Sequence, residues 1–277
     1  MYRIGMSSCD FPLTEENFAA LNENKISAVE ISMQPELYKD IDYKKLKNLS
    51  EKYAVELWSY HLPFSPFSEI DISFKDKAKR ESTVGYLSEL IKKAADIGID
   101  KFVIHASGEP IGDTERAERL KCAMLSLDTL AETACRCGGT IAVEDLPRTC
   151  LGNTSDEIIA LLGANDKLRV CFDTNHLLQE DNLNFMKKLS DKIITVHISD
   201  YDFTNEKHWL PGEGELNWRE MYSAFKEKGY SGVWMYEIGL KCPKTITRDR
   251  DLNFSDFYNN AMSIFSQKQP AALGVRK

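Results

Sequence analysis

Thr140-Ile-Ala-Val-Glu144 is followed by a helical pattern at Ser155–Leu162 and then by Leu168-Arg-Val-Cys-Phe172, a second strand-like run that leads into Asp173. Two strands joined through a helix form a parallel pair, because parallel neighbours need a long crossover between them. Each run is apolar until a carboxylate follows at its end. Since a buried carboxylate without a partner costs several kcal/mol, the pattern predicts parallel strands that carry functional acids at their C-terminal ends.

The same strand–helix unit repeats along the whole chain. The predicted strands are Tyr2–Met6, Ala28–Ser32, Val55–Tyr60, Lys101–Ile104, Thr140–Glu144, Leu168–Phe172, Ile193–His197 and Gly232–Glu237. The predicted helices are Thr14–Asn22, Tyr43–Tyr53, Asp76–Ile97, Thr114–Cys135, Ser155–Leu162, Leu183–Leu189, Trp218–Lys228 and Asn253–Phe265. Eight such units predict an α/β fold of the (β/α)8 TIM-barrel type.

We expect a single barrel domain over residues 1–266. The competing fold is a doubly wound open sheet, which would carry a glycine-rich phosphate turn after its first strand, and Gly5-Met-Ser-Ser-Cys-Asp10 matches that turn poorly. Residues 267–277 lack an apolar pattern, so we expect a disordered C-terminal tail there.

Composition narrows the class of protein. The 277 residues include 35 Lys and Arg against 43 Asp and Glu, and a net charge of −8 disfavours non-specific binding to nucleic acid. No apolar run approaches the roughly 20 residues of a membrane helix, and the N-terminus lacks the pattern of a signal peptide. Seven cysteines, an odd number, indicate reduced thiols and not a disulfide framework. We therefore expect a cytoplasmic enzyme.

Six consecutive predicted strands lead into a side chain that can bind a metal. These are His61, His105, Glu144, Asp173, His197 and Glu237. In a TIM barrel the C-terminal strand ends meet at one rim, where the active site is built. Converging carboxylates and imidazoles at that rim predict at least one bound metal ion. Glu30, on the second predicted strand, could also face the barrel interior.

The candidate ligands do not select a single metal. Glu144, Asp173, His197 and Glu237 form a carboxylate-rich set, which suits Mn²⁺, Mg²⁺ or Co²⁺. His61, His105, His176 and His208 supply further nitrogens and favour Zn²⁺ and more than one ion. The number of metals therefore stays open.

At these residues the chain resembles the xylose-isomerase-like TIM-barrel superfamily, which includes sugar isomerases and epimerases, inosose dehydratases and endonucleases of the endonuclease IV type. The segments that carry the resemblance are Tyr60-His-Leu-Pro63, Val103-Ile-His105, Val143-Glu-Asp-Leu-Pro147, Cys171-Phe-Asp-Thr-Asn-His176, Val196-His-Ile-Ser-Asp-Tyr201, Pro211-Gly-Glu-Gly-Glu215 and Tyr236-Glu237. They span nearly the whole chain and are specific as a combination.

The resemblance implies different site roles in its branches. In the epimerase branch, positions like Glu144, Asp173, His197 and Glu237 hold one ion, the two glutamates exchange protons with the substrate, and a residue like His176 holds the sugar. In the endonuclease branch, three zinc ions also use positions like His61, His105, His176 and an Asp-x-His pair. Here that pair is Glu206-Lys-His208, and several epimerases have an arginine where this chain has Tyr201-Asp-Phe203.

We therefore predict a metal-dependent isomerase or epimerase that acts on a small sugar, keto-polyol or sugar phosphate through an enediolate. Glu144 and Glu237 would be its acid–base pair. The alternatives are a dehydratase that uses the same metal and base, and a multi-zinc phosphodiesterase that acts on abasic DNA.

Trp209, Phe64 and Phe67 are candidate walls of the substrate pocket. Lys241, Lys244, Arg248 and Arg250 form either a phosphate site or a solvated charge run. The oligomeric state stays open.

Overall fold

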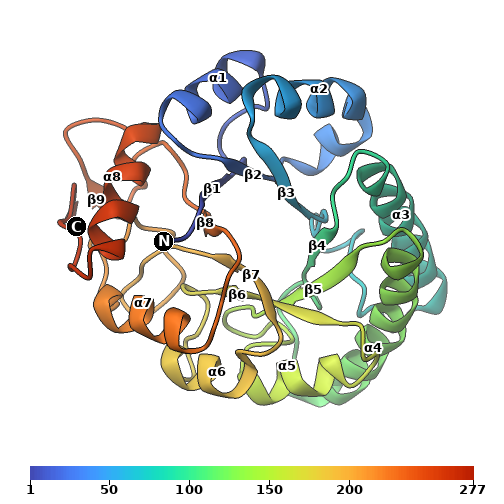
Figure 1. The fold of residues 1–277 in the computed structure, drawn as a ribbon. Helices are drawn as coiled ribbons and strands as arrows, with labels where there is room; N and C mark the ends of the chain where they lie inside the picture. Colours follow the sequence, from blue (N-terminus) through green and yellow to red (C-terminus); the bar gives the residue numbers. More distant parts are fainter.

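The computed structural model describes residues 1–277. Figure 1 shows the strands in the middle of the molecule with the helices around them. The barrel strands are β1 (Ile4–Ser7), β2 (Ala28–Ile31), β3 (Glu56–His61), β4 (Lys101–Ile104), β5 (Thr140–Glu144), β6 (Arg169–Asp173), β7 (Ile193–His197) and β8 (Trp234–Tyr236). The helices are α1 (Glu15–Glu23), α2 (Tyr43–Tyr53), α3 (Lys77–Ala95), α4 (Asp113–Arg136), α5 (Ser155–Leu162), α6 (Asn182–Leu189), α7 (Trp218–Glu227) and α8 (Phe254–Phe265), with a short 3₁₀ helix η1 (Pro35–Asp40) before α2.

All eight strands form one parallel sheet in the order β7-β6-β5-β4-β3-β2-β1-β8. The two edges meet through Ile198, which bridges to Tyr236 and donates its amide to the Met235 carbonyl at 2.7 Å. The sheet therefore forms a nearly closed barrel, and the predicted TIM-barrel fold is confirmed.

The barrel interior contains two small apolar clusters, separate from the main core of 61 residues between strands and helices. Their members are Ala28, Trp58, Val233 and Met235 in one cluster and Val103, Ala142 and Cys171 in the other. Because side chains alternate along a strand, the residue two positions later faces the same way, nearer the C-terminal rim. Ala28, Val103, Ala142, Cys171 and Met235 are thus followed by Glu30, His105, Glu144, Asp173 and Glu237.

Several helices begin or end at residues that favour these positions. Thr14, Thr154 and Asn217 accept hydrogen bonds from the first turns of α1, α5 and α7. Gly98 and Gly229 follow α3 and α7 with φ of 97° and 76°. Most of the predicted bounds differ from the observed ones by a residue or two. No bound differs by more than two residues, a difference found at the starts of β1 and β8 and at the end of α3.

Residues 267–277 differ from the predicted disordered tail. Val275–Arg276 form β10, which pairs antiparallel with β9 (Ile246–Thr247) beside α8 (Figure 1). The Gln269 side chain accepts from the Trp218 amide and donates to the Leu216 carbonyl, both at 2.9 Å. Polar contacts and backbone pairing hold this segment in place. Because neither requires a periodic pattern of apolar residues, the sequence did not indicate that the segment is ordered.

All seven cysteines are free thiols, as predicted. None of the helices is long and apolar enough to cross a membrane.

Candidate metal centre and cavity

Glu144, at the end of β5, is the centre of a buried cluster of imidazoles. Its Oε1 lies 2.9 Å from His197 Nδ1, and its Oε2 lies 3.1 Å from the Nε2 atoms of both His61 and His105. These histidines come from the ends of β7, β3 and β4, three different strands. The barrel thus brings together residues that are far apart in the sequence, as the strand-end pattern predicted.

Asp173 and Glu237 complete a four-residue set with Glu144 and His197. Asp173 pairs with His197 in the β6–β7 register, and His197 Nδ1 lies 3.9 Å from Asp173 Oδ2 and 3.3 Å from Glu237 Oε2. One potential ligand atom from each member lies within 4.8 Å of all the others. We call these four residues the carboxylate–imidazole set.

The donor chemistry of this set fits a divalent cation. Asp173 is fully buried, and its Oδ2 has no hydrogen-bond partner. An unsatisfied carboxylate oxygen in a dry interior is costly unless a cation or a proton neutralises it. Three carboxylates and one imidazole are ligands that Mn²⁺, Mg²⁺ or Co²⁺ accept readily.

Glu30 lies beneath this set, on the other side of His197. It is fully buried, its carboxylate lies 3.0 Å from His197 Nε2, and it accepts a hydrogen bond from Ser59 Oγ at 2.7 Å. From the sequence, Glu30 was predicted only as a residue that could face the barrel interior. It does face the interior, where it contacts the predicted metal ligand His197.

His176, Glu206 and His208 form a second group, which also has ligand atoms within 4.8 Å of one another. His176 Nε2 lies 3.4 Å from Glu206 Oε2 and 3.6 Å from Asp173 Oδ2, so the group adjoins the carboxylate–imidazole set. The other oxygen of Glu206 lies 2.9 Å from Arg148 Nη1. Glu206 is therefore shared between an imidazole and a guanidinium.

The pKa values in the cluster move in opposite directions. Burial disfavours the ionised form of Glu144, but His197 and His105 outweigh burial and hold its pKa well below the ordinary value. Burial also opposes protonation of His61, yet Glu144 and neighbouring carboxylates raise its pKa to about 9. Burial raises the pKa of Asp173 to about 6. The pKa of His197 is raised as well, whereas burial lowers that of His105, so His61 and His197 are the imidazoles that favour a positive charge beside Glu144.

A cavity of about 460 Å³ opens above the cluster. His61, His105, Glu144, His176, Glu206, His208 and Glu237 all line it, together with Phe64, Phe67, Glu109, Leu146 and Arg148. Phe64 stacks on His105 at 4.0 Å between ring centroids, so it forms a wall as predicted. Trp209 is buried away from the cavity and donates to Thr245, so its predicted role as a wall is wrong.

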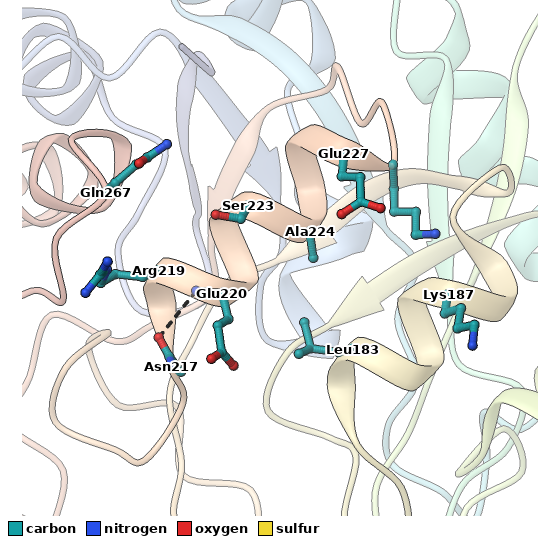
Figure 2. A pocket seen from close by; sticks show the side chains of 10 residues that line it. Leu183, Lys187, Asn217, Arg219, Glu220, Ser223, Ala224, Glu227 and Gln267 are labelled. Atoms are coloured by element: carbon teal, nitrogen blue, oxygen red, sulfur yellow. Dashed lines mark hydrogen bonds between the residues drawn. The ribbon is translucent and has the colours of Figure 1, made fainter.

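A larger hollow of about 690 Å³ lies on the outer surface between α6 and α7 (Figure 2). Its lining includes Lys187, Arg219, Glu220, Glu227 and Lys228, charges of both signs that form no ligand group. No candidate site residue reaches it. We therefore place the candidate site at the smaller cavity, where the titratable groups converge.

The basic segment after β8 does not form a phosphate site. The Arg248 side chain is buried and paired with Glu213 at 2.6 Å, and Arg250 pairs with Asp256 at 2.7 Å. Lys241 and Lys244 remain exposed. Neither predicted alternative, a phosphate site or a solvated charge run, included the buried ion pair between Arg248 and Glu213.

Three residues at the site had no clear sequence signal. Cys171 lies beneath Glu144 and His197 as a third possible ligand there. Arg148 and Glu109 pair across the cavity mouth from the loops after β5 and β4. Period-2 alternation could have placed Cys171, two residues before Asp173, in the interior. Nothing local in the sequence indicates that Arg148 and Glu109 meet.

The chain belongs to the xylose isomerase-like TIM barrel family, whose model matches residues 18–251. A protein of Methanocaldococcus jannaschii is 28% identical over 199 residues, which cover 69% of this chain and 67% of the relative. Among solved structures, a D-tagatose 3-epimerase-like protein matches with a TM-score of 0.79 and 24% identity, over 96% of this chain and 97% of its own. A family 2 AP endonuclease from Brucella melitensis matches with a TM-score of 0.72 and 19% identity, over 88% and 95%. At these identities the two structures share the fold, which alone does not decide the reaction.

Proposed function

We propose that this protein is a metal-dependent sugar isomerase or epimerase. The observation that carries the proposal is the carboxylate–imidazole set at the base of a cavity of about 460 Å³, with an unpartnered oxygen of Asp173 within the set. The likeness to a D-tagatose 3-epimerase-like protein supports this choice within a family of several activities.

Glu144, Asp173, His197 and Glu237 would hold the divalent ion. Bound there, the ion would supply Lewis acidity toward the carbonyl and adjacent hydroxyl oxygens of a keto sugar. His197 and Asp173 are fully buried and remote from the cavity opening, so they suit a holding role. Glu144 and Glu237 line the cavity and can reach a substrate as well.

Glu144 and Glu237 would carry out the proton transfer. One carboxylate removes the proton from the carbon next to the carbonyl. The electron pair of that C–H bond forms a new C=C bond, and the π pair of the carbonyl moves to its oxygen to give an enediolate. The other carboxyl group returns a proton to the opposite face in an epimerisation, or a proton returns to the neighbouring carbon in an isomerisation. Because the two glutamates come from β5 and from the end of β8, they approach the cavity from different strands.

The cavity wall suits a small polyol. His176, Glu206 and Arg148 offer hydrogen-bonding groups for hydroxyls, and Phe64 and Phe67 offer apolar faces. The volume of about 460 Å³ falls within the ordinary range for small-molecule sites.

Glu144→Gln and Glu237→Gln test the proposal on a panel of ketoses and polyols. Each variant should lose roughly 100-fold or more of kcat, because general acid–base groups contribute about that much. The fold should persist, as measured by circular dichroism. Elemental analysis of the wild type should find one divalent ion per chain. Full activity in both variants would contradict the proposed acid–base pair.

Product analysis in the same assay separates an epimerase or isomerase from a dehydratase, since loss of water changes the mass of the product.

A second candidate function, multi-zinc phosphodiester hydrolysis, is favoured by one observation. His61 with His105, and His176 with Glu206 and His208, offer two further ligand groups beside the carboxylate–imidazole set. Two or three zinc ions per chain and cleavage of DNA with abasic sites would select that candidate.

A further inference from the structure

Glu30 is a carboxylate that the proposed chemistry does not use. It lies on β2, is fully buried, and does not line the cavity, so a substrate cannot reach it. Burying such a group is costly unless a specific partner compensates. Its partners are His197 Nε2 at 3.0 Å and Ser59 Oγ at 2.7 Å.

We propose that Glu30 is a positioning residue that fixes the orientation and tautomer of His197, so that Nδ1 is the metal-binding atom. The inference rests on the proposed function, because it assigns a role toward the ion that the carboxylate–imidazole set would hold.

The assignment follows from the chemistry of the two ring nitrogens. An ionised carboxylate only accepts hydrogen bonds, so contact with Glu30 requires a proton on Nε2 of His197. Nδ1 also faces a carboxylate, Glu144, and a bound cation would displace the proton from this nitrogen. Because Glu30 holds the proton on Nε2, the lone pair of the resulting neutral imidazole is on Nδ1. That atom lies 2.9 Å from Glu144 Oε1 and 3.3 Å from Glu237 Oε2, within the proposed ligand set. Glu30 thus turns the free nitrogen of His197 toward the other ligands.

The strands hold Glu30 in this position. The β2–β3 register shifts between Val29 and Glu30, and the shift sets Glu30 directly opposite Ser59. An irregularity of this kind re-aims side chains near a site. Ser59, itself fully buried, donates to one Glu30 oxygen and restricts the rotation of the carboxylate.

Glu30→Gln and Glu30→Leu separate positioning from packing. The glutamine keeps the size of the side chain, but its amide can donate as well as accept, so it no longer enforces a proton on Nε2. The leucine removes the acceptor. Asp71→Asn is the matched control, because Asp71 is also a buried acid but pairs with Arg119, outside the cluster around His197.

Mn²⁺ affinity, measured by competition with a chromophoric chelator, is the first measurement. Both Glu30 variants should bind Mn²⁺ roughly 10- to 100-fold more weakly than the wild type, the usual effect of losing the partner of a metal-binding histidine. Asp71→Asn should bind as the wild type does.

Nitrogen-15 NMR of the Zn²⁺-loaded protein is the second measurement, with the His197 signals assigned by their loss in His197→Gln. The wild type should show a protonated Nε2 and a metal-shifted Nδ1, and Glu30→Gln should show a mixture of tautomers. Wild-type affinity and a wild-type His197 spectrum in Glu30→Gln would overturn the inference and leave the proposed function intact. A wild-type protein that binds neither Mn²⁺ nor Zn²⁺ would overturn both.

Discussion

Arg148 lies in the loop after β5 in a left-handed backbone conformation, with φ of 52°. A residue with a Cβ adopts this conformation only when its surroundings compensate the strain. The compensation here is a set of charge-assisted contacts with Glu109, Asn205 and Glu206. Arg148 thereby joins the loops after β4, β5 and β7 across the cavity mouth, and it holds one oxygen of Glu206 while the other faces His176.

Replacing Arg148 with methionine should raise KM for the substrate roughly 10-fold or more, a loss of about 1.4 kcal/mol or more that matches one charge-assisted hydrogen bond. Glu206 would lose its anchor, whereas Glu144 and Glu237 would keep their contacts, so kcat should change little. Steady-state kinetics measure both constants.

Arg148→Lys is the informative companion variant. Lysine keeps the positive charge but cannot form the forked contacts of a guanidinium, so we expect it to resemble the methionine variant. A lysine variant with wild-type KM would show that charge alone, and not the bridge between three loops, is what the cavity needs.

At the level of elements, the strands and the residues at their ends were predictable, because each strand is a local apolar run and the barrel places all C-terminal ends at one rim. His61, His105, Glu144, Asp173, His197 and Glu237 followed from that rule alone. Glu30 also lies on a strand, but its proposed positioning role depends on contact with His197, which is 167 residues away in the sequence. No local pattern encodes such a partner.

Helix α8 begins with a capping box, in which Asn253 accepts from the first turn and the Asp256 carboxylate accepts from the Asn253 amide at 2.8 Å. Arg250 reinforces Asp256 from the preceding segment. Burial opposes ionisation of Asp256, but Arg250 and the Asn253 amide outweigh burial and lower its pKa below the ordinary value of 3.8. Asp256 therefore stabilises the fold when ionised.

Asp256→Asn should lower the free energy of unfolding by about 1 kcal/mol at neutral pH, the usual value of a helix cap. The contribution of a carboxyl group with a lowered pKa is present above its unfolded-state pKa and is lost as the pH falls through its folded-state pKa. The gap between wild type and variant should therefore close below the ordinary pKa of 3.8. Urea unfolding across this pH range measures it.

Asp249→Asn is the matched control, since Asp249 is an exposed acid one residue from Arg250 and forms no ion pair. It should be as stable as the wild type at every pH. A gap between Asp256→Asn and the wild type that stays constant with pH would contradict the role of the charge.

At the scale of the molecule, the loop between β7 and α7 connects the candidate site to the C-terminal segment. It carries Glu206 and His208 at the cavity, and Asp200 at its start accepts from the Gly212 and Leu216 amides and from the Trp218 indole. The loop is tightly packed: a Cβ on Gly214 would lie 2.1 Å from Asp200 Oδ1. Its far side meets the chain end.

The C-terminal segment covers that far side. Gly212 has φ of 100°, and a Cβ there would lie 2.4 Å from the Pro270 carbonyl oxygen. Gln269 bonds to both Leu216 and Trp218, where the loop enters α7. The buried Arg248–Glu213 pair ties the segment before α8 to the same loop. The end of the chain thus supports a loop that reaches the cavity.

Deleting residues 268–277 should therefore affect both stability and substrate binding. Loss of the two Gln269 hydrogen bonds alone amounts to about 2 kcal/mol, which corresponds to a fall in Tm of roughly 4–8 °C in a protein of this size. KM should rise as well, because Glu206 and His208 lie on the loop that loses its support. Deleting only residues 275–277, which removes β10 and keeps Gln269 and Pro270, should have a smaller effect on both quantities. Calorimetry and steady-state kinetics on the full chain and the two deletions measure them. Equal Tm and KM in all three proteins would show that the segment rests on the barrel without supporting the loop.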